Sequence, residues 1–196
     1  MTSDRWLIVG LGNPGTEYSH NRHNVGYWCI NRLAREHGIG LKARSLAAIC
    51  EGEISGQKVT LLKPRTYVNR SGHAVAPALR HAHVAIERMI VVYDELDLPA
   101  GRVRIKPKGG HGGHNGLRSI AAAVASTGFP RIRVGIGRPH VGGEPSWEPD
   151  VVAGYVLGDP APAEVETLRT AVSNAAKAIE MILAEGVEAA MNRYNK

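Results

Sequence analysis

The chain of 196 residues has little cysteine, few aromatic residues and no long apolar run. Its two cysteines, Cys29 and Cys50, are too few for a disulfide framework, and each lies among apolar residues, as buried thiols do. No segment approaches the roughly 20 apolar residues of a membrane helix, and the apolar run at 6–9 is too short for a signal peptide. We therefore predict a protein of the reducing cytoplasm that does not associate with membranes.

The composition is otherwise that of a folded protein. Hydrophobic residues make up 43% and charged residues 21% of the chain, which excludes a disordered or collagen-like protein. Strand-like apolar runs alternate with helix-like periodicity, so we predict a single α/β domain over residues 1–196, with a twisted, mixed and largely parallel sheet flanked by helices. We expect Asn24 to cap the first helix and residues 138–150 to form a surface loop. The expected strands are 6–9, 58–63, 89–93, 102–108 and 131–136, and the expected helices are 25–37, 115–125 and 165–183.

The formal charge of +6 is distributed unevenly along the chain. Residues 98–143 contain eight Lys and Arg and no acid, whereas residues 144–190 contain nine acids and two bases. Period-two spacing on two expected strands predicts one basic face, which suits phosphate groups. A solvated surface without a partner is the alternative, and we expect the acidic stretch to face away from a polyanion. The basic face would consist of Arg102, Arg104, Lys106, Lys108, Arg131 and Arg133.

Residues 10–15 fit G-x-G-x-x-G, the fingerprint of dinucleotide-binding proteins. That fingerprint requires a helix to begin at its last glycine, but residues 16–23 are polar and aperiodic. We therefore favour a strand that ends in a tight turn and presents the side chain of Asn13. A role for Asn13 as a turn residue alone is the alternative.

Titratable side chains gather in two places where α/β proteins carry active sites. The polar loop 18–24 contains His20 and His23, and histidine is a candidate general base because it titrates near neutral pH. Asp94 and Asp97 directly follow the apolar run 89–93, at the end of an expected central strand. A carboxylate at this position would orient a histidine and stabilise its charged form, although a surface turn is the alternative.

A glycine-rich loop at 109–116 surrounds His111, His114 and Asn115. It lacks the G-K-[ST] ending of a nucleotide phosphate loop, and its histidines have no recognised metal-ligand spacing, so we predict no metal site. Its glycines allow close approach of a polymer, while Asn115 offers a donor and an acceptor. In the segment 63–72, Tyr67 is suited to stacking on a base or sugar and Asn69 to binding a carbonyl.

Five motifs occur together and in order: VGLGNPG at 9–15, Y-x-x-x-R-H-N-x-G at 18–26, P-x-T-Y-x-N-x-S-G at 64–72, DELDLP at 94–99 and GGHGGHNGL at 109–117. Together they resemble the bacterial-type peptidyl-tRNA hydrolases, from about residue 6 to residue 193. The resemblance implies an esterase that cleaves the bond between peptide and tRNA in peptidyl-tRNA released prematurely from ribosomes, so that the tRNA is recycled. It implies no metal and no cofactor, and a monomer that binds the acceptor stem and 3′ end of the tRNA.

The resemblance also implies roles for single residues. His23 would be the general base that activates water, Asp94 would hold its imidazole, and Asn13 would contact the peptide. Asn69 and Asn115 would bind the 3′ end of the substrate and stabilise the oxyanion. The remaining implied contacts are Tyr18, Tyr67 and His114 beside the site, and Lys106 and Arg133 as a clamp on the tRNA 5′-phosphate.

Two departures and two alternatives accompany this resemblance. Val68 stands where methionine is common in the family and Asn21 where threonine is common, but neither removes a proposed catalytic group. The chain has no serine in a nucleophile elbow and no credible Cys–His pair, which favours direct attack by water. The alternatives are a non-catalytic RNA-binding protein on the same fold, which the intact His23 and Asp94 disfavour, and a nucleotide-dependent oxidoreductase.

Overall fold

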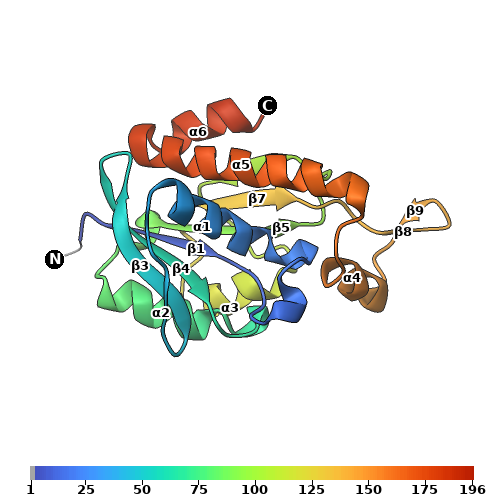
Figure 1. Cartoon of the computed structure of the whole chain (residues 1–196), viewed down its shortest axis with the longest axis horizontal. Coiled ribbons are helices and arrows are strands. Elements are labelled where there is room, and N and C mark those ends of the chain that lie inside the picture. Colours follow the sequence, from blue (N-terminus) through green and yellow to red (C-terminus); the bar gives the residue numbers. More distant parts are fainter. Residues whose placement is uncertain (1–2) are drawn as a thin grey trace.

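The structure is a computed structural model that describes residues 3–196 (Figure 1). Seven strands form one sheet in the order β2-β3-β4-β1-β5-β7-β6. The four central strands are parallel: β4 (Gln57–Pro64), β1 (Trp6–Gly10), β5 (Met89–Glu95) and β7 (Arg131–Gly135). The strands toward the edges pair in antiparallel fashion: β2 (Lys42–Ala43), β3 (Ala47–Ile54) and β6 (Val103–Lys106). The predicted α/β class with a mixed, largely parallel sheet is thus confirmed.

Helices cover both faces of this sheet (Figure 1). One face packs against α1 (Val25–Glu36) and α5 (Pro162–Glu185), with α6 (Val187–Tyr194) beside α5 and β6. The other face packs against α2 (Gly72–His81) and α3 (Asn115–Val124). At one end of the molecule lie the hairpin of β8 (His140–Val141) and β9 (Glu144–Pro145) and the short helix α4 (Pro149–Val156). That all these elements form one domain stays a prediction.

Two apolar cores hold the layers together. Along β1, Ile8 packs into the core beneath α1 and α5, whereas Leu7 and Val9 pack into the core beneath α2 and α3. All three side chains are fully buried, and such burial contributes about 1.5–3 kcal/mol for each residue. The alternation explains why a strand with an unbroken apolar sequence lies at the centre of the sheet.

Two glycines allow α1 to lie directly against β1. A Cβ atom on Gly10 would lie 2.2 Å from the carbonyl oxygen of Gly26, and one on Gly26 would lie 2.5 Å from the amide nitrogen of Leu11. No larger residue fits at either position without moving the helix. The close approach brings the turn before α1, which contains His23, to the carboxyl end of β1.

Most expected elements are present, but several structural predictions were wrong or incomplete. Asn24 is the N-cap residue of α1 as expected, but its side chain makes no capping bond and binds the Asn13 backbone instead. The basic strand is shorter than predicted, since β6 ends at Lys106. Residues 138–150 do lie at the surface, although they contain the hairpin and the start of α4. No expected element corresponds to β2, β3, β8, β9, α4 or α6.

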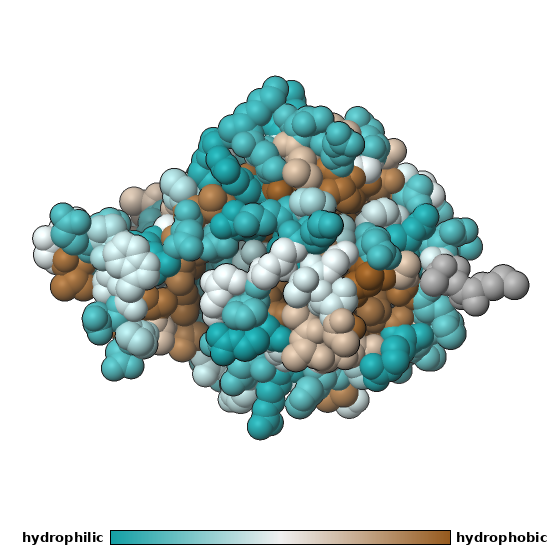
Figure 2. Space-filling view, turned by 180° about the vertical axis from the view of Figure 1, so that it is seen from behind, coloured by the Kyte–Doolittle hydropathy of each residue, from teal (hydrophilic) through white to brown (hydrophobic). Residues whose placement is uncertain are grey.

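The surface differs between the two ends of the molecule. Figure 2 shows apolar side chains on the protruding end, next to largely hydrophilic surface. Four exposed apolar residues belong to this end of the chain: Val141, Trp147, Val151 and Leu157. Across residues 3–196, no helix has the length and apolar character needed to cross a membrane.

Candidate active site

The candidate active site lies where β1 and β5 end and α3 begins. His23 lies in a single 3-10 turn, Arg22–Asn24, directly before α1. Asp94 is the sixth residue of β5 and is buried, and His114 precedes the first residue of α3. These are the carboxyl ends of parallel strands, where open α/β sheets bind their ligands.

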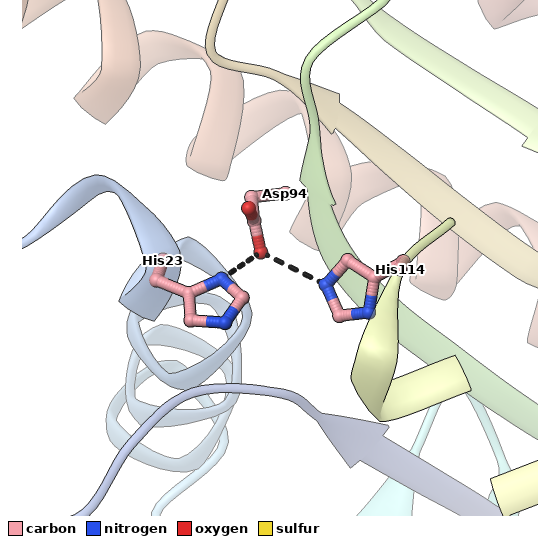
Figure 3. A group of neighbouring side chains, drawn as sticks. All are labelled: His23, Asp94 and His114. Atoms are coloured by element: carbon pink, nitrogen blue, oxygen red, sulfur yellow. Dashed lines mark hydrogen bonds and ion pairs between the residues drawn. The ribbon is translucent and has the colours of Figure 1, made fainter. Parts of the chain in front are cut away.

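Both histidines contact one oxygen of Asp94 (Figure 3). His23 Nδ1 lies 2.7 Å from Asp94 Oδ1, and His114 Nε2 lies 3.1 Å from the same oxygen. The two imidazole rings are 5.4 Å apart, and the ring of Tyr93 meets His114 edge to face at 4.9 Å. Asp94 therefore holds two rings through a single buried oxygen.

The hydrogen bonds assign the protons on both rings. His114 Nδ1 accepts from the backbone N–H groups of Gly116 and Leu117, at 3.1 and 3.3 Å, so it carries no proton. Its Nε2 must therefore donate to Asp94. His23 donates from Nδ1 to the same carboxylate, and its Nε2 has no hydrogen-bond partner within residues 3–196. Nε2 of His23 is thus available as a base.

The site perturbs both ionisations in directions that suit a general base. Burial by itself would lower the pKa of His23, but the charge of Asp94 and the hydrogen bond to it raise that pKa above the ordinary value of 6.5. Burial by itself would raise the pKa of Asp94, but the charge of His23 and the hydrogen bonds from both rings hold it well below its ordinary value. Asp94 therefore stays ionised and stabilises a protonated His23.

Asn13 is held in place through both its backbone and its side chain. Its N–H donates to Asn24 Oδ1 at 2.8 Å, and its carbonyl accepts from Asn24 Nδ2 at 3.0 Å. Its own Oδ1 accepts from the Val68 N–H at 2.8 Å. The Asn13 amide NH₂ makes no hydrogen bond to residues 3–196, and Asn13 lines the cavity beside His23. The loop after β1 thus places the Asn13 side chain at the cavity, as the sequence led us to expect.

A cavity of about 470 Å³ brings together most of the residues singled out in the sequence. The side chains of Asn69 and Asn115 are exposed, with their amide groups unbonded to other described residues. Tyr18 and Tyr67 meet edge to face at 6.4 Å, and Tyr67 is 58% exposed. Eight of the ten candidate residues line the cavity: Asn13, Tyr18, His23, Tyr67, Asn69, Asp94, His114 and Asn115.

The other two candidates, Lys106 and Arg133, lie outside the cavity on neighbouring strands. Lys106 is exposed on β6, whereas Arg133 on β7 donates from Nε to Glu95 Oε2 at 2.9 Å. The expectation that Arg131 shares this exposed face is wrong, because it is 1% exposed. Its guanidinium donates to the carbonyls of Gly110 and Thr127 and stacks on the ring of Phe129. Arg131 therefore supports the glycine-rich loop from inside the protein.

Sequence reasoning missed one side of the cavity. An apolar surface from α4 and the residues flanking it, which we call the α4 wall, consists of Pro149, Val152, Ala153, Val156 and Leu157. The signal was the apolar run 151–157 inside an otherwise acidic stretch. Leu96, inside the DELDLP motif, also lines the cavity.

The histidines and Asp94 also form a group with the size of a metal site. One ligand atom from each of His23, Asp94 and His114 lies within 4.8 Å of the others. However, the two ring nitrogens that face Asp94 donate protons to it, so a metal ion would have to displace both protons. Within residues 3–196, the imidazole of His111 accepts only from the nearby Gly113 N–H, and His20 lines a second cavity between α1 and α5.

The glycine motif at 10–15 does not begin a helix. Two 3-10 turns, Thr16–Tyr18 and Arg22–Asn24, follow Gly15, and α1 begins only at Val25. No α-helix therefore begins at the last glycine of this loop, as the dinucleotide fingerprint requires for the binding of a pyrophosphate. The dinucleotide alternative loses its structural basis.

The chain matches known proteins over nearly its whole length. The family model described as peptidyl-tRNA hydrolase matches residues 7–196. The peptidyl-tRNA hydrolase of Chloroflexus aggregans is 45% identical, and the match covers 97% of this chain and 98% of the relative. The peptidyl-tRNA hydrolase of Dichelobacter nodosus is 43% identical, and the match covers 95% of this chain and 96% of the relative. A crystal structure of peptidyl-tRNA hydrolase from Acinetobacter baumannii is 40% identical and superposes with a TM-score of 0.90, covering 100% of this chain and 96% of that one. The chain therefore belongs to the peptidyl-tRNA hydrolase family.

Proposed function

We propose that this chain hydrolyses the ester that links a peptide to the terminal ribose of tRNA in peptidyl-tRNA, with His23 as the general base. The observation that carries the proposal is the buried His23–Asp94 contact, which leaves Nε2 of His23 facing a cavity that is lined by three asparagines. A single well-placed base together with amide donors is sufficient for ester hydrolysis near neutral pH. The relatives named above are all hydrolases, and nothing in the comparisons favours the non-catalytic RNA-binding alternative.

In the proposed reaction, Nε2 of His23 takes a proton from water as the water oxygen attacks the ester carbonyl. Asp94 stabilises the imidazolium that forms, since it stays ionised. Amide N–H groups of Asn13, Asn69 and Asn115 are the available donors for the oxyanion of the tetrahedral intermediate. The ribose oxygen then leaves and takes the proton back from His23, which releases the peptide acid and free tRNA.

Each remaining candidate has a place in this proposal. Tyr18, Tyr67 and His114 border the terminal nucleotide or the peptide, and His114 also helps to hold Asp94. Lys106 and Arg133 bind the 5′-phosphate of the acceptor stem. The enzyme acts in the cytoplasm as a monomer on peptidyl-tRNA lost from ribosomes, without metal or cofactor.

The test is deacylation of N-acetyl-aminoacyl-tRNA by the purified chain in the presence of EDTA and without added nucleotide. We expect release of free tRNA and of the N-acetyl amino acid. Aminoacyl-tRNA with a free amino group is the matched control substrate, and we expect slower cleavage of it. Binding of tRNA without any cleavage would contradict the proposal and favour the RNA-binding alternative.

A further inference from the structure

Four consecutive residues hold the turn at His23 to three separate parts of the protein. Asn24 binds the backbone of Asn13 at the end of β1, and His23 binds Asp94 at the end of β5. The two residues before them, Asn21 and Arg22, bind the corner between α4 and α5 instead: Asn21 Nδ2 donates to the carbonyl of Leu157 at 2.5 Å. The residues adjacent to the base thus contact the segment that ends the α4 wall.

Arg22 makes the most extensive of these contacts. Its side chain is 9% exposed and donates from one terminal nitrogen to the carbonyls of Tyr155 and Gly158, at 3.2 and 3.3 Å. The other terminal nitrogen lies 2.6 Å from Glu164 Oε2, and the guanidinium lies 4.1 Å from the centre of the Tyr155 ring. Its backbone N–H also donates to Gly158. A planar guanidinium is the only side chain that supplies these donors in one plane and stacks at the same time.

Glu164 connects Arg22 to the start of α5. The carboxylate oxygen that binds Arg22 also accepts from the Ala161 N–H at 2.8 Å, which caps this helix. Burial by itself would raise the pKa of Glu164, but the hydrogen bonds from Arg22 and Ala161 lower it, so Glu164 is ionised at neutral pH. The ion pair therefore joins the turn at His23, the end of α4 and the start of α5.

Helix α4 has little else to hold it. None of its residues is fully buried: Val152 and Ala153 line the cavity, and only Tyr155 and Val156 pack, partly buried, against the core beneath α1 and α5. Beside this partial packing and the contacts with Asn21 and Arg22, the Tyr155 hydroxyl donates to the carbonyl of Ile136 at 2.6 Å. Stability from apolar packing, the usual source for a helix of this length, is thus small.

We propose that Arg22, paired with Glu164, is a positioning residue that sets the distance between the α4 wall and His23 and thereby determines which acyl side chains the enzyme accepts. The proposal rests on the proposed function, because it assigns the space between His23 and the α4 wall to the amino acid that carries the ester. Arg22 does not touch His23 Nε2 or Asp94, so it acts on the substrate's fit and not on the base.

The experiment compares Arg22→Lys, Glu164→Gln and the double variant on two substrates, N-acetyl-phenylalanyl-tRNA and N-acetyl-glycyl-tRNA. Losing the charge-assisted hydrogen bonds of Arg22 is expected to raise KM for the phenylalanyl substrate about tenfold. For the glycyl substrate, which has no side chain to meet the α4 wall, we expect a change of about twofold or less. The double variant should resemble either single variant, since both remove one interaction. Arg32→Lys is the matched control, because Arg32 pairs with Glu36 within α1, at 2.8 Å, and lines the second cavity instead of the candidate site.

Two further readouts separate positioning from a general loss of stability. Backbone amides of residues 152–158 should exchange with solvent faster in Arg22→Lys, while those of α1 stay unchanged. The midpoint of the pH–rate profile should not move, because the pKa of His23 is set by burial and by Asp94. Equal KM changes for the two substrates, unchanged exchange in 152–158, or a shifted pH midpoint would each overturn the proposal. The exchange readout does not depend on catalysis, and a wild-type chain that cleaves neither substrate would refute the proposed function itself.

Discussion

At the scale of single residues, the site depends on how each polar atom is used. The side-chain oxygen of Asn13 accepts a hydrogen bond from the Val68 N–H. Its NH₂ group has no hydrogen-bond partner within residues 3–196 and is available at the cavity. Asp94 uses one oxygen for two imidazoles, which directs Nε2 of His23 toward the cavity. The roles we propose for these residues follow from the donor or acceptor atoms that have no hydrogen-bond partner within the described protein.

Asn13→Asp tests whether the NH₂ group of Asn13 acts as a hydrogen-bond donor to the substrate. The carboxylate can still accept from the Val68 N–H, but it has no donor for the oxyanion or the peptide. We expect kcat/KM for N-acetyl-aminoacyl-tRNA to fall about 10²–10³-fold, as it does when an oxyanion donor is removed. Asn31→Asp introduces the same charge on the outer surface of α1 and is the control. Equal, small losses in the two variants would contradict a specific role for Asn13.

The position of a residue could be predicted from the sequence where a local motif determines it, but not where contacts with a loop determine it. His23, Asp94 and Asn115 could be singled out because each lies in a distinctive motif at an element boundary. Arg131 was misplaced, since alternation shows which residues share a strand face and not whether a loop covers that face. The Gly110 and Thr127 carbonyls that bind Arg131 lie 21 and 4 residues away in sequence, and no local pattern reveals them.

At the scale of elements, the strands with strong apolar runs were predictable and the short pieces were not. β1 and β5 have unbroken apolar runs, whereas β2, β8 and β9 contain two residues each. Helix α4 has no buried face, so it lacks the periodic apolar stripe that identifies most helices. Its position against the cavity depends on contacts with the distant Asn21 and Arg22.

Helix α3 gives a prediction at this scale, because His114 is both its N-cap and a partner of Asp94. His114→Ala removes the cap, and we expect the free energy of unfolding to fall by about 1 kcal/mol. Asparagine is a good N-cap, so His114→Asn should lose less stability although it also lacks the bond to Asp94. Chemical denaturation of both variants measures the difference. Equal destabilisation would show that the cap is not the source of the stability.

At the scale of the whole molecule, charge is separated between the two faces of the sheet. Val103 and Ile105 of β6 point into the core beneath α5, so Arg104 and Lys106 point to the opposite face. The longest elements of the acidic stretch are α5, on the face away from Lys106, and α4, which borders the cavity. That the acidic stretch faces away from a polyanion stays a prediction, and it must hold for an α4 that borders the cavity.

The proposed phosphate clamp gives a prediction about salt dependence. Lys106→Ala combined with Arg133→Ala should weaken binding of 5′-phosphorylated tRNA and reduce the slope of log K against log salt concentration by about 1–2. We expect Lys106 to contribute more, because Arg133 already pairs with Glu95. Arg169→Ala with Lys177→Ala on α5 removes the same charge from the other face and is the control. An unchanged slope in the first variant would remove the clamp from this account.

The most direct measurement of the central claim, that His23 is a base poised by Asp94, is the pH dependence of kcat/KM for N-acetyl-aminoacyl-tRNA. The rate should rise with pH as His23 loses its proton, with a midpoint above 6.5, because the pKa of His23 is raised. Asp94→Asn removes the charge that raises this pKa, so the midpoint should move to lower pH while the plateau rate falls about 10²–10⁴-fold. A wild-type profile without this rise, or an Asp94→Asn profile with the same midpoint and rate, would contradict the account.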